Sequence, residues 1–363
     1  MLDLKKNTVA EWMLKEGYTE VTLMDFYRDI YPEEVLRADN KGSAKDEGMG
    51  RVQIVVHSTK KVMGSNEKGY AKPFFKDLSG LKMAIDKSNK LNLFVLKINS
   101  NEFDYDLLVD MLLDPVIDYS ISRQVKEKYK NRPATLSKKA REKFVEYARN
   151  NGELGELLLF CFLETHLGAP KILTKLELKT STSHYVNGAD GVHFLKLPDG
   201  NYQLIFGESK TYQDIDGAIR DAFKSIYNFK NGINDKGNQK SGIQYEKSLI
   251  SDNLFKEAFS DEERDFLESL IYPTKNRNFD VDDAFGIFIG FQIDVSDEEK
   301  EMPTSDFRKL VKSRVDDEVS KYLTSIQQKI IDNKLQGHNF YIYVLPFTDI
   351  NSKRKKIMEA ITK

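Results

Sequence analysis

Residues 202–210 read YQLIFGESK, a run of apolar and aromatic residues that ends in charged ones. Such a run predicts a buried β-strand. Side chains of a strand alternate between its two faces, so Glu208 and Lys210 are expected to project from one face at its carboxyl end. This pair favours a catalytic role. A solvated ion pair on an exposed strand face, worth little in stability, explains the same residues.

The segment upstream, NGADGVHFLKL at residues 187–197, predicts a neighbouring strand that begins beside glycines. Asp190 precedes Glu208 by 18 residues, a suitable length for one hairpin. An antiparallel pair brings the start of one strand beside the end of the other. We therefore expect Asp190 to lie beside Glu208 and Lys210.

A helix is predicted over residues 153–167, within GELGELLLFCFLETHL. Glu156 shares its apolar stripe with Leu159, Phe160 and Leu163, and a carboxylate on a buried stripe is costly unless it is paired or binds a metal. Complementing the positive N-terminal end of the helix is the alternative role, which suits Glu153 better.

Two carboxylates and a lysine at strand ends form a set that can hydrolyse phosphodiesters. Mg²⁺ prefers oxygen ligands and uses one or two carboxylates, which leaves room for water and a substrate phosphate. The metal lowers the pKa of bound water, and an ammonium group such as that of Lys210 orients the water or stabilises the transition state.

The order of helix, strand, strand beginning with Asp190, strand ending in ESK and helix resembles the core of the PD-(D/E)xK nucleases. Four segments also resemble the HamA family, the nuclease subunits of the Hachiman anti-phage system: GELGELLL, TKLELKTSTS, NGADGVH and FGESKTYQDIDGAIRDAFKSI. The resemblance is strongest over residues 150–230. Ala189 stands where the superfamily name has proline. The resemblance implies a restriction-endonuclease-like α/β fold, a mixed central sheet flanked by helices.

The resemblance also implies roles for individual residues. Asp190 and Glu208 become metal ligands, Lys210 the catalytic lysine, Glu156 the acid that completes the metal site, and the Ser209 carbonyl a further ligand. The implied cofactor is Mg²⁺, with Mn²⁺ as a substitute. Candidate contacts to nucleic acid are Lys175, Lys179, Arg220 and Lys224, although for the two strand lysines a solvated strand face is equally consistent. The implied partners are DNA and a helicase of the same defence system.

The chain is longer than a nuclease core requires, which predicts an N-terminal α/β domain over residues 1–145 for regulation or partner docking. The nuclease domain is then expected over residues 146–363. A basic segment at residues 120–150 separates the two, and it is either a phosphate-binding surface or a solvated helix face. Ten basic residues there face three acidic ones: Arg123, Lys126, Lys128, Lys130, Arg132, Lys138, Lys139, Arg141, Lys143 and Arg149 against Glu127, Glu142 and Glu146.

Further elements follow from apolar periodicity. The expectations are a helix at 103–112 ended by Pro115, an amphipathic helix at 214–230, a strand at 284–291, one long helix through 310–330 and a final strand at 339–347. The 363 residues carry a formal net charge of -2, which excludes a uniformly basic nucleic-acid binder but not a local patch. A single cysteine, no signal-like N-terminus and no long apolar run favour the cytoplasm.

Two other functions remain open on the residues alone. The fold can serve as a binding module for nucleic acid or protein without cutting it, or the enzyme can be an RNA-directed nuclease. Intact Asp190, Glu208 and Lys210 favour an active enzyme over a silent module.

Overall fold

The computed structural model describes residues 79–86, 88–147, 152–174, 176, 188–239, 242–273 and 278–363. They belong to a compact unit that spans Tyr70–Lys363. The predicted strand residues Lys175 and Lys179 lie outside the described residues.

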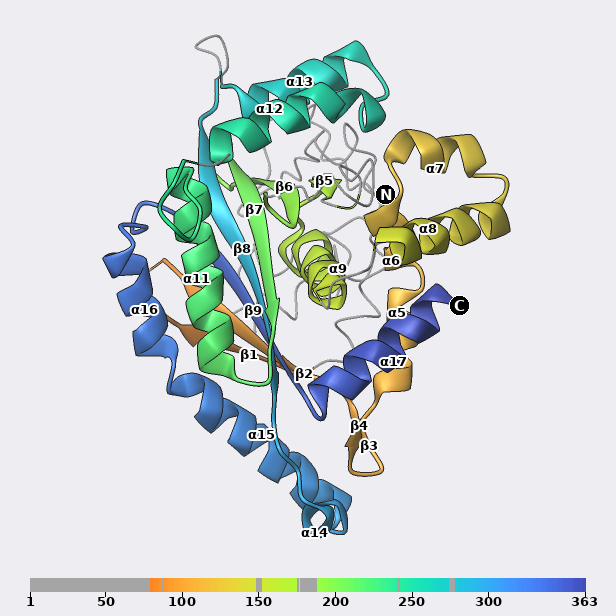
Figure 1. The fold of residues 1–363 in the computed structure, drawn as a ribbon, viewed down its shortest axis with the longest axis vertical. Helices are drawn as coiled ribbons and strands as arrows, with labels where there is room; N and C mark the ends of the chain where they lie inside the picture. The colour runs from red at the N-terminus through yellow and green to blue at the C-terminus, as the bar shows by residue number, and fades with distance from the viewer. Residues whose placement is uncertain are drawn as a thin grey trace, which may run out of the picture. The chain divides into compact units, whose positions relative to one another are not determined.

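A mixed seven-stranded sheet forms the centre of this unit, in the order β1-β2-β9-β8-β7-β6-β5 (Figure 1). Strands β2, β9, β8 and β7 run parallel, whereas β1, β6 and β5 are antiparallel to their neighbours. The strands are β1 (Ser79–Ala84), β2 (Lys90–Val95), β5 (Lys171–Thr174), β6 (Gly191–Lys196), β7 (Tyr202–Thr211), β8 (Val281–Gln292) and β9 (Phe340–Phe347). A separate two-stranded ribbon joins β3 (Ile98–Asn99) to β4 (Glu102–Phe103).

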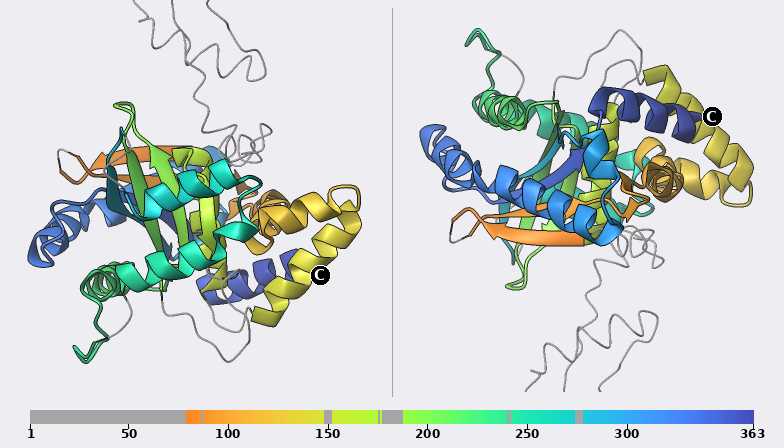
Figure 2. Two further views of the ribbon diagram at one scale, coloured as in Figure 1. Left: turned by 90° about the horizontal axis from the view of Figure 1, so that it is seen from above. Right: turned by 90° about the horizontal axis from the view of Figure 1, so that it is seen from below.

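Helices lie on both faces of the sheet (Figure 2). They are α5 (Tyr105–Leu112), α6 (Pro115–Ser120), α7 (Arg123–Tyr129), α8 (Pro133–Tyr147), α9 (Glu153–Phe162), α11 (Ile215–Asn231), α12 (Ile243–Asn253), α13 (Asp261–Ile271), α14 (Asp297–Lys300), α15 (Thr304–Ser320), α16 (Leu323–Asp332) and α17 (Ile350–Thr362). A π-helical turn, η2 (Leu163–Leu167), continues α9, and a 3-10 turn, η3 (Leu254–Lys256), follows α12.

Helix α9 covers one face of the sheet and α11 covers the other. On the α9 face, Phe162 stacks on Phe288 of β8 and Tyr343 of β9, with ring centroids 6.0 and 4.8 Å apart. On the α11 face, Phe223 packs on Phe340 at 5.6 Å. Central strands buried on both faces need apolar side chains at successive positions, which explains the uninterrupted run in β8.

Most of the predicted elements are confirmed, and three details differ. The helix predicted from residue 103 begins at Tyr105, because Phe103 belongs to strand β4. The long helix expected through 310–330 is two helices, because the chain turns at Lys321 and Tyr322 between α15 and α16. Pro115 does not only end a helix; it begins α6, where its missing N–H costs nothing at the first position.

The first strands of the described chain belong to the same sheet as the last one. Residues 90–93 of β2 pair in parallel with residues 341–344 of β9, so the sheet crosses the predicted division at residue 145. A regulatory or docking role for the N-terminal part stays a prediction, since residues 1–78 lie outside the described part of the chain. In the described residues, no helix has the length and apolarity to span a membrane.

Candidate active site

The carboxyl end of β7 carries the predicted Glu208 and Lys210. Their side chains form an ion pair, with Lys210 Nζ 2.5 Å from Glu208 Oε1. Both side chains are largely buried, that of Glu208 being 15% exposed and that of Lys210 21% exposed. Burial acts to lower the pKa of Lys210, but the charge and hydrogen bond of Glu208, with a contribution from Asp190, raise it above the usual value. The lysine is therefore held as an ammonium ion.

Asp190 lies beside this end of β7, as the hairpin predicts. Val192 of β6 pairs with Phe206 of β7, and the Asp190 N–H donates to the Gly207 carbonyl at 2.8 Å. β6 begins only at Gly191, so the backbone of β7 extends past it. There the buried Asp190 takes the place of a strand partner: its Oδ2 accepts from the Ser209 N–H and the Ser209 hydroxyl, each at 2.8 Å.

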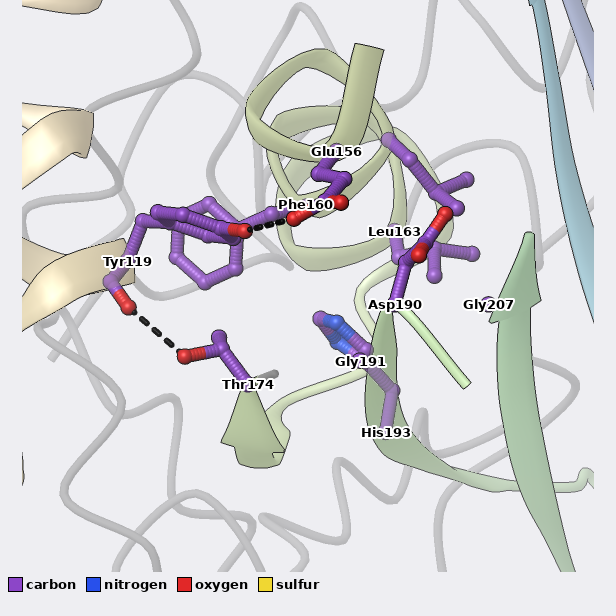
Figure 3. A pocket seen from close by; sticks show the side chains of 10 residues that line it. Tyr119, Glu156, Phe160, Leu163, Thr174, Asp190, Gly191, His193 and Gly207 are labelled. Carbon is purple, nitrogen blue, oxygen red and sulfur yellow. Dashed lines mark hydrogen bonds between the residues drawn. The ribbon is translucent and has the colours of Figure 1, made fainter. Parts of the chain in front are cut away.

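Glu156 and Asp190 line one small pocket under α9, together with Tyr119, Thr174 and His193 (Figure 3). The Tyr119 hydroxyl donates to Glu156 Oε2 at 2.7 Å, and the Tyr119 carbonyl accepts from the Thr174 hydroxyl at 2.9 Å. Burial, and then the negative charge of Glu156, raise the pKa of Tyr119 well above its usual value. Tyr119 therefore remains a hydrogen-bond donor that fixes the Glu156 carboxylate.

The predicted site residues lie on two different faces of β7. A Cβ built on Gly155 of α9 would lie 2.7 Å from Thr211 Oγ1, so α9 packs on the face of odd-numbered residues. Phe206 packs on Phe229 of α11 at 5.3 Å, which places the even-numbered face against α11. By strand alternation, Glu208 and Lys210 project on the α11 face, whereas Glu156 and Asp190 share the pocket on the α9 face.

The structure thus brings the predicted residues together in two pairs, Glu208 with Lys210 and Glu156 with Asp190. Asp190 connects the pairs, because it lines the pocket with Glu156 and also raises the pKa of Lys210. Within the described part of the chain, no three His, Cys, Asp or Glu side chains are arranged to hold a metal ion. The single cluster of Glu156, Asp190 and Glu208 stays a prediction.

The donor set at the end of β7 nevertheless suits Mg²⁺. Asp190 and Glu208 supply two carboxylates, the number that Mg²⁺ normally takes from a protein. Ser209 directs its N–H toward Asp190, and the N–H and C=O of one strand residue point to the same side. Its carbonyl oxygen is therefore a third hard donor on the same edge.

The other predicted contacts lie elsewhere. Arg220 on α11 is exposed and lies 3.8 Å from Asp216 and 3.2 Å from Asp221. Lys224 lies 3.2 Å from Asp235. Both belong to solvated ion pairs on the outer surface of α11, and neither lines the pocket.

Two residues of the site were not singled out from the sequence. Tyr119 reaches Glu156 from α6, 37 positions earlier in the chain, and no local pattern relates the two. His193, which is 1% exposed, hydrogen-bonds the Ala169 carbonyl through Nδ1 at 2.9 Å. Burial lowers the pKa of His193 to about 4, so it is a neutral structural residue.

Comparisons with known proteins give one match. No curated protein and no solved structure matches this sequence. The model of the HamA family matches residues 72–361, which include every strand and helix described above apart from the last residue of α17. The chain therefore belongs to the HamA family.

Proposed function

We propose that this chain is a metal-dependent nuclease with a PD-(D/E)xK-type core that cuts DNA in anti-phage defence. Membership of the HamA family implies a component of the Hachiman defence system. The nuclease assignment goes further, and one observation carries it. The supporting observation is that Asp190 accepts from the N–H of Ser209, whose neighbours in the chain, Glu208 and Lys210, form an ion pair.

In this proposal, Asp190, Glu208 and the Ser209 carbonyl hold Mg²⁺ or Mn²⁺. When bound, the metal supplies an activated water and neutralises negative charge that develops on the phosphate. Lys210 carries a fixed positive charge beside the same carboxylates, where it orients the attacking water and stabilises the transition state. Glu156, held by Tyr119, adds a carboxylate on the α9 side of Asp190.

A direct test compares wild type with Lys210→Ala on plasmid, single-stranded DNA and RNA, in Mg²⁺, Mn²⁺ and EDTA. Removing one group that stabilises the transition state lowers the rate by roughly 10²–10³-fold. Lys247→Ala is the matched control, because Lys247 also belongs to a partly buried ion pair, 2.8 Å from Asp283. Both variants lose an ammonium of similar burial, and only Lys210→Ala is expected to lose cleavage.

The three substrates decide between the remaining functions. Cleavage of DNA but not RNA supports the proposal, and the reverse preference assigns an RNA-directed nuclease. If wild type cuts none of them with either metal, or if Lys210→Ala cuts at the wild-type rate, the nuclease assignment is wrong. A helicase of the same system is proposed to control this activity, which predicts that adding it changes the cleavage rate of wild type.

A further inference from the structure

Helix α17 begins with an unusual concentration of positive charge. Residues 353–356 read KRKK, and Glu359 is the only acidic residue of the helix. No carboxylate lies within ion-pair distance of these four cations in the part of the chain that the structure describes. Lys355 and Lys356 are exposed. In a chain with a net charge of -2, this charge is a local feature of the surface.

Arg354 connects α17 to the candidate active site. Its Nη1 donates to the carbonyl of Thr211 at 3.3 Å, and Thr211 directly follows Lys210 on β7. Its Nη2 donates to Asn351 Oδ1, also at 3.3 Å. Both acceptors are neutral. Burial lowers the pKa of Arg354, whereas the charge of Glu153 acts to raise it. The planar fork of the guanidinium suits a phosphate.

The corner that leads into α17 is held rigidly, so Arg354 has a defined position. Tyr105 Oη accepts from the Thr348 N–H at 2.8 Å, and the Ile350 N–H donates to Gln292 Oε1 at 3.2 Å. Because β7, β8 and β9 are parallel, their carboxyl ends meet at one edge of the sheet, which is where ligands of α/β folds bind.

Helix α8 extends the positive surface away from this edge. It packs against α17, and the two helices lie side by side in both views of Figure 2. Lys139 is exposed, and its Nζ lies 5.1 Å above the ring of Tyr129. The Nε of Arg141 is buried and has no hydrogen-bond partner among the described residues.

We propose that α17 and α8 form a surface, here called the basic path, that binds the phosphate backbone of the nucleic acid and leads it to the end of β7. Arg354 forms its inner end, and Lys355, Lys356 and Lys139 form its outer part. The regularly spaced phosphates of a nucleic acid fit this surface better than a protein partner does, because its exposed residues are mostly lysines. Among the described residues, Lys355, Lys356 and Lys139 form no ion pair with a carboxylate. The basic path rests on the proposed nuclease function, and its test separates the two.

The experiment measures binding in EDTA, so that binding does not depend on cleavage. Labelled duplex and single-stranded DNA are titrated with full-length wild type, Arg354→Gln, Lys139→Glu and the double variant Lys355→Glu/Lys356→Glu at several salt concentrations. The control is Lys309→Glu/Lys312→Glu, an equal charge change at exposed positions of α15. α15 lies apart from α17 in Figure 1.

The double variant on α17 is expected to bind at least tenfold more weakly at 100 mM salt. The slope of log affinity against log salt is expected to fall by about 1.8 on duplex, or about 1.4 on single strands, for two lost phosphate contacts. Arg354→Gln and Lys139→Glu each remove one phosphate contact, so each is expected to lower this slope by about half as much as the double variant does. The α15 control is expected to stay within twofold of wild type.

Other outcomes separate the two proposals. If the α17 variants bind like wild type, or if the α15 control weakens equally, the basic path is wrong even when wild type cuts DNA. If binding depends on α17 as expected but wild type cuts no nucleic acid with Mg²⁺ or Mn²⁺, the basic path stands and the nuclease function fails.

Discussion

At the scale of single residues, Asp190 has a structural task as well as its proposed catalytic one. It accepts two hydrogen bonds from Ser209, and bonds to a charged group contribute roughly 1.5–3 kcal/mol each. We expect Asp190→Asn to lower the free energy of unfolding in EDTA by about 1–2 kcal/mol, because the amide oxygen retains part of this bonding. Urea denaturation of both proteins measures the difference.

Repeating the comparison of wild type and Asp190→Asn with metal present tests whether Asp190 is a ligand. A ligand that binds only the native state stabilises it by about 2.7 kcal/mol at a hundredfold excess over its dissociation constant. Adding Mg²⁺ or Mn²⁺ should raise the unfolding free energy of wild type and leave that of Asp190→Asn almost unchanged. A variant that is more stable than wild type in EDTA would instead indicate that carboxylate repulsion dominates at this site.

His193 makes the stability depend on pH. Burial lowers the pKa of His193 in the folded protein to about 4 from its ordinary value of about 6.5, so the unfolded chain binds the proton more tightly. Stability is therefore lost as pH falls from 6.5 toward 4, by about 2 kcal/mol between pH 7 and pH 5. His193→Asn should reduce this dependence, measured as the change in unfolding free energy between the two pH values. An identical pH dependence in the variant would show that other groups cause it.

The positions of the site residues could be predicted from the sequence to different extents. Asp190 was predicted beside Glu208 because the register of a short hairpin follows from its length. Parity predicted that Glu208 and Lys210 share a face, but not that α11 covers that face while α9 covers the other. This depends on packing between distant segments, and so the contact between Tyr119 and Glu156 could not be predicted either.

At the scale of elements, Gly155 decides how closely α9 approaches β7. A methyl group there would lie 2.7 Å from Thr211 Oγ1 and 3.3 Å from Ser209 Cβ. Overpacking costs typically 1–3 kcal/mol, whereas alanine gains about 1 kcal/mol over glycine in a helix. We expect Gly155→Ala to destabilise the protein by about 1 kcal/mol and to reduce cleavage, because it displaces Glu156 from Asp190.

Gly337 provides the matched control for this substitution. A Cβ built there meets nothing within 4 Å, so Gly337→Ala should leave both stability and cleavage near wild type. Urea midpoints and cleavage rates of the two variants test the argument together. Equal effects at the two positions would show that the approach of α9 does not limit the site.

Elements with strong periodicity were predicted well, and those set by long-range contacts were not. The residues of α11 form one apolar stripe, capped by Asp214, and their helix was predicted to within about two residues. The break between α15 and α16 was missed, because Val319 and Ile326 are both buried and continue the apolar pattern across the turn. Periodicity reports burial, and burial can persist where the backbone changes direction.

At the scale of the whole molecule, the parallel strands gather groups from across the chain. β7 brings Lys210 to one edge of the sheet, Asp190 lies beside it directly before β6, and α17 brings Arg354 to the carbonyl of Thr211, which follows Lys210. The site therefore needs both the hairpin near residue 200 and the last helix. Only the hairpin carries a recognisable motif, which is why Arg354 could not be predicted from the sequence.

The limits of the folding unit give the last prediction. The compact unit begins at Tyr70, and the family match begins at residue 72. A chain of residues 70–363 keeps β2 paired with β9 and keeps Phe94 packed on Phe162 at 5.0 Å. We expect it to unfold cooperatively and to bind nucleic acid, as measured by thermal unfolding and titration.

A chain of residues 146–363, the predicted nuclease domain, is expected to aggregate or unfold without a transition. Its β9 becomes an exposed edge, which promotes association between chains, and Glu156 loses the hydrogen bond from Tyr119. The two chains are compared under identical conditions by light scattering and thermal unfolding. A cooperative transition of the shorter chain at the same temperature would support the predicted boundary at residue 145 and would mean that β1, β2 and α5–α8 pack on an independently stable domain. The sheet order argues against that outcome, because β2 completes the parallel half of the sheet on which α9 rests.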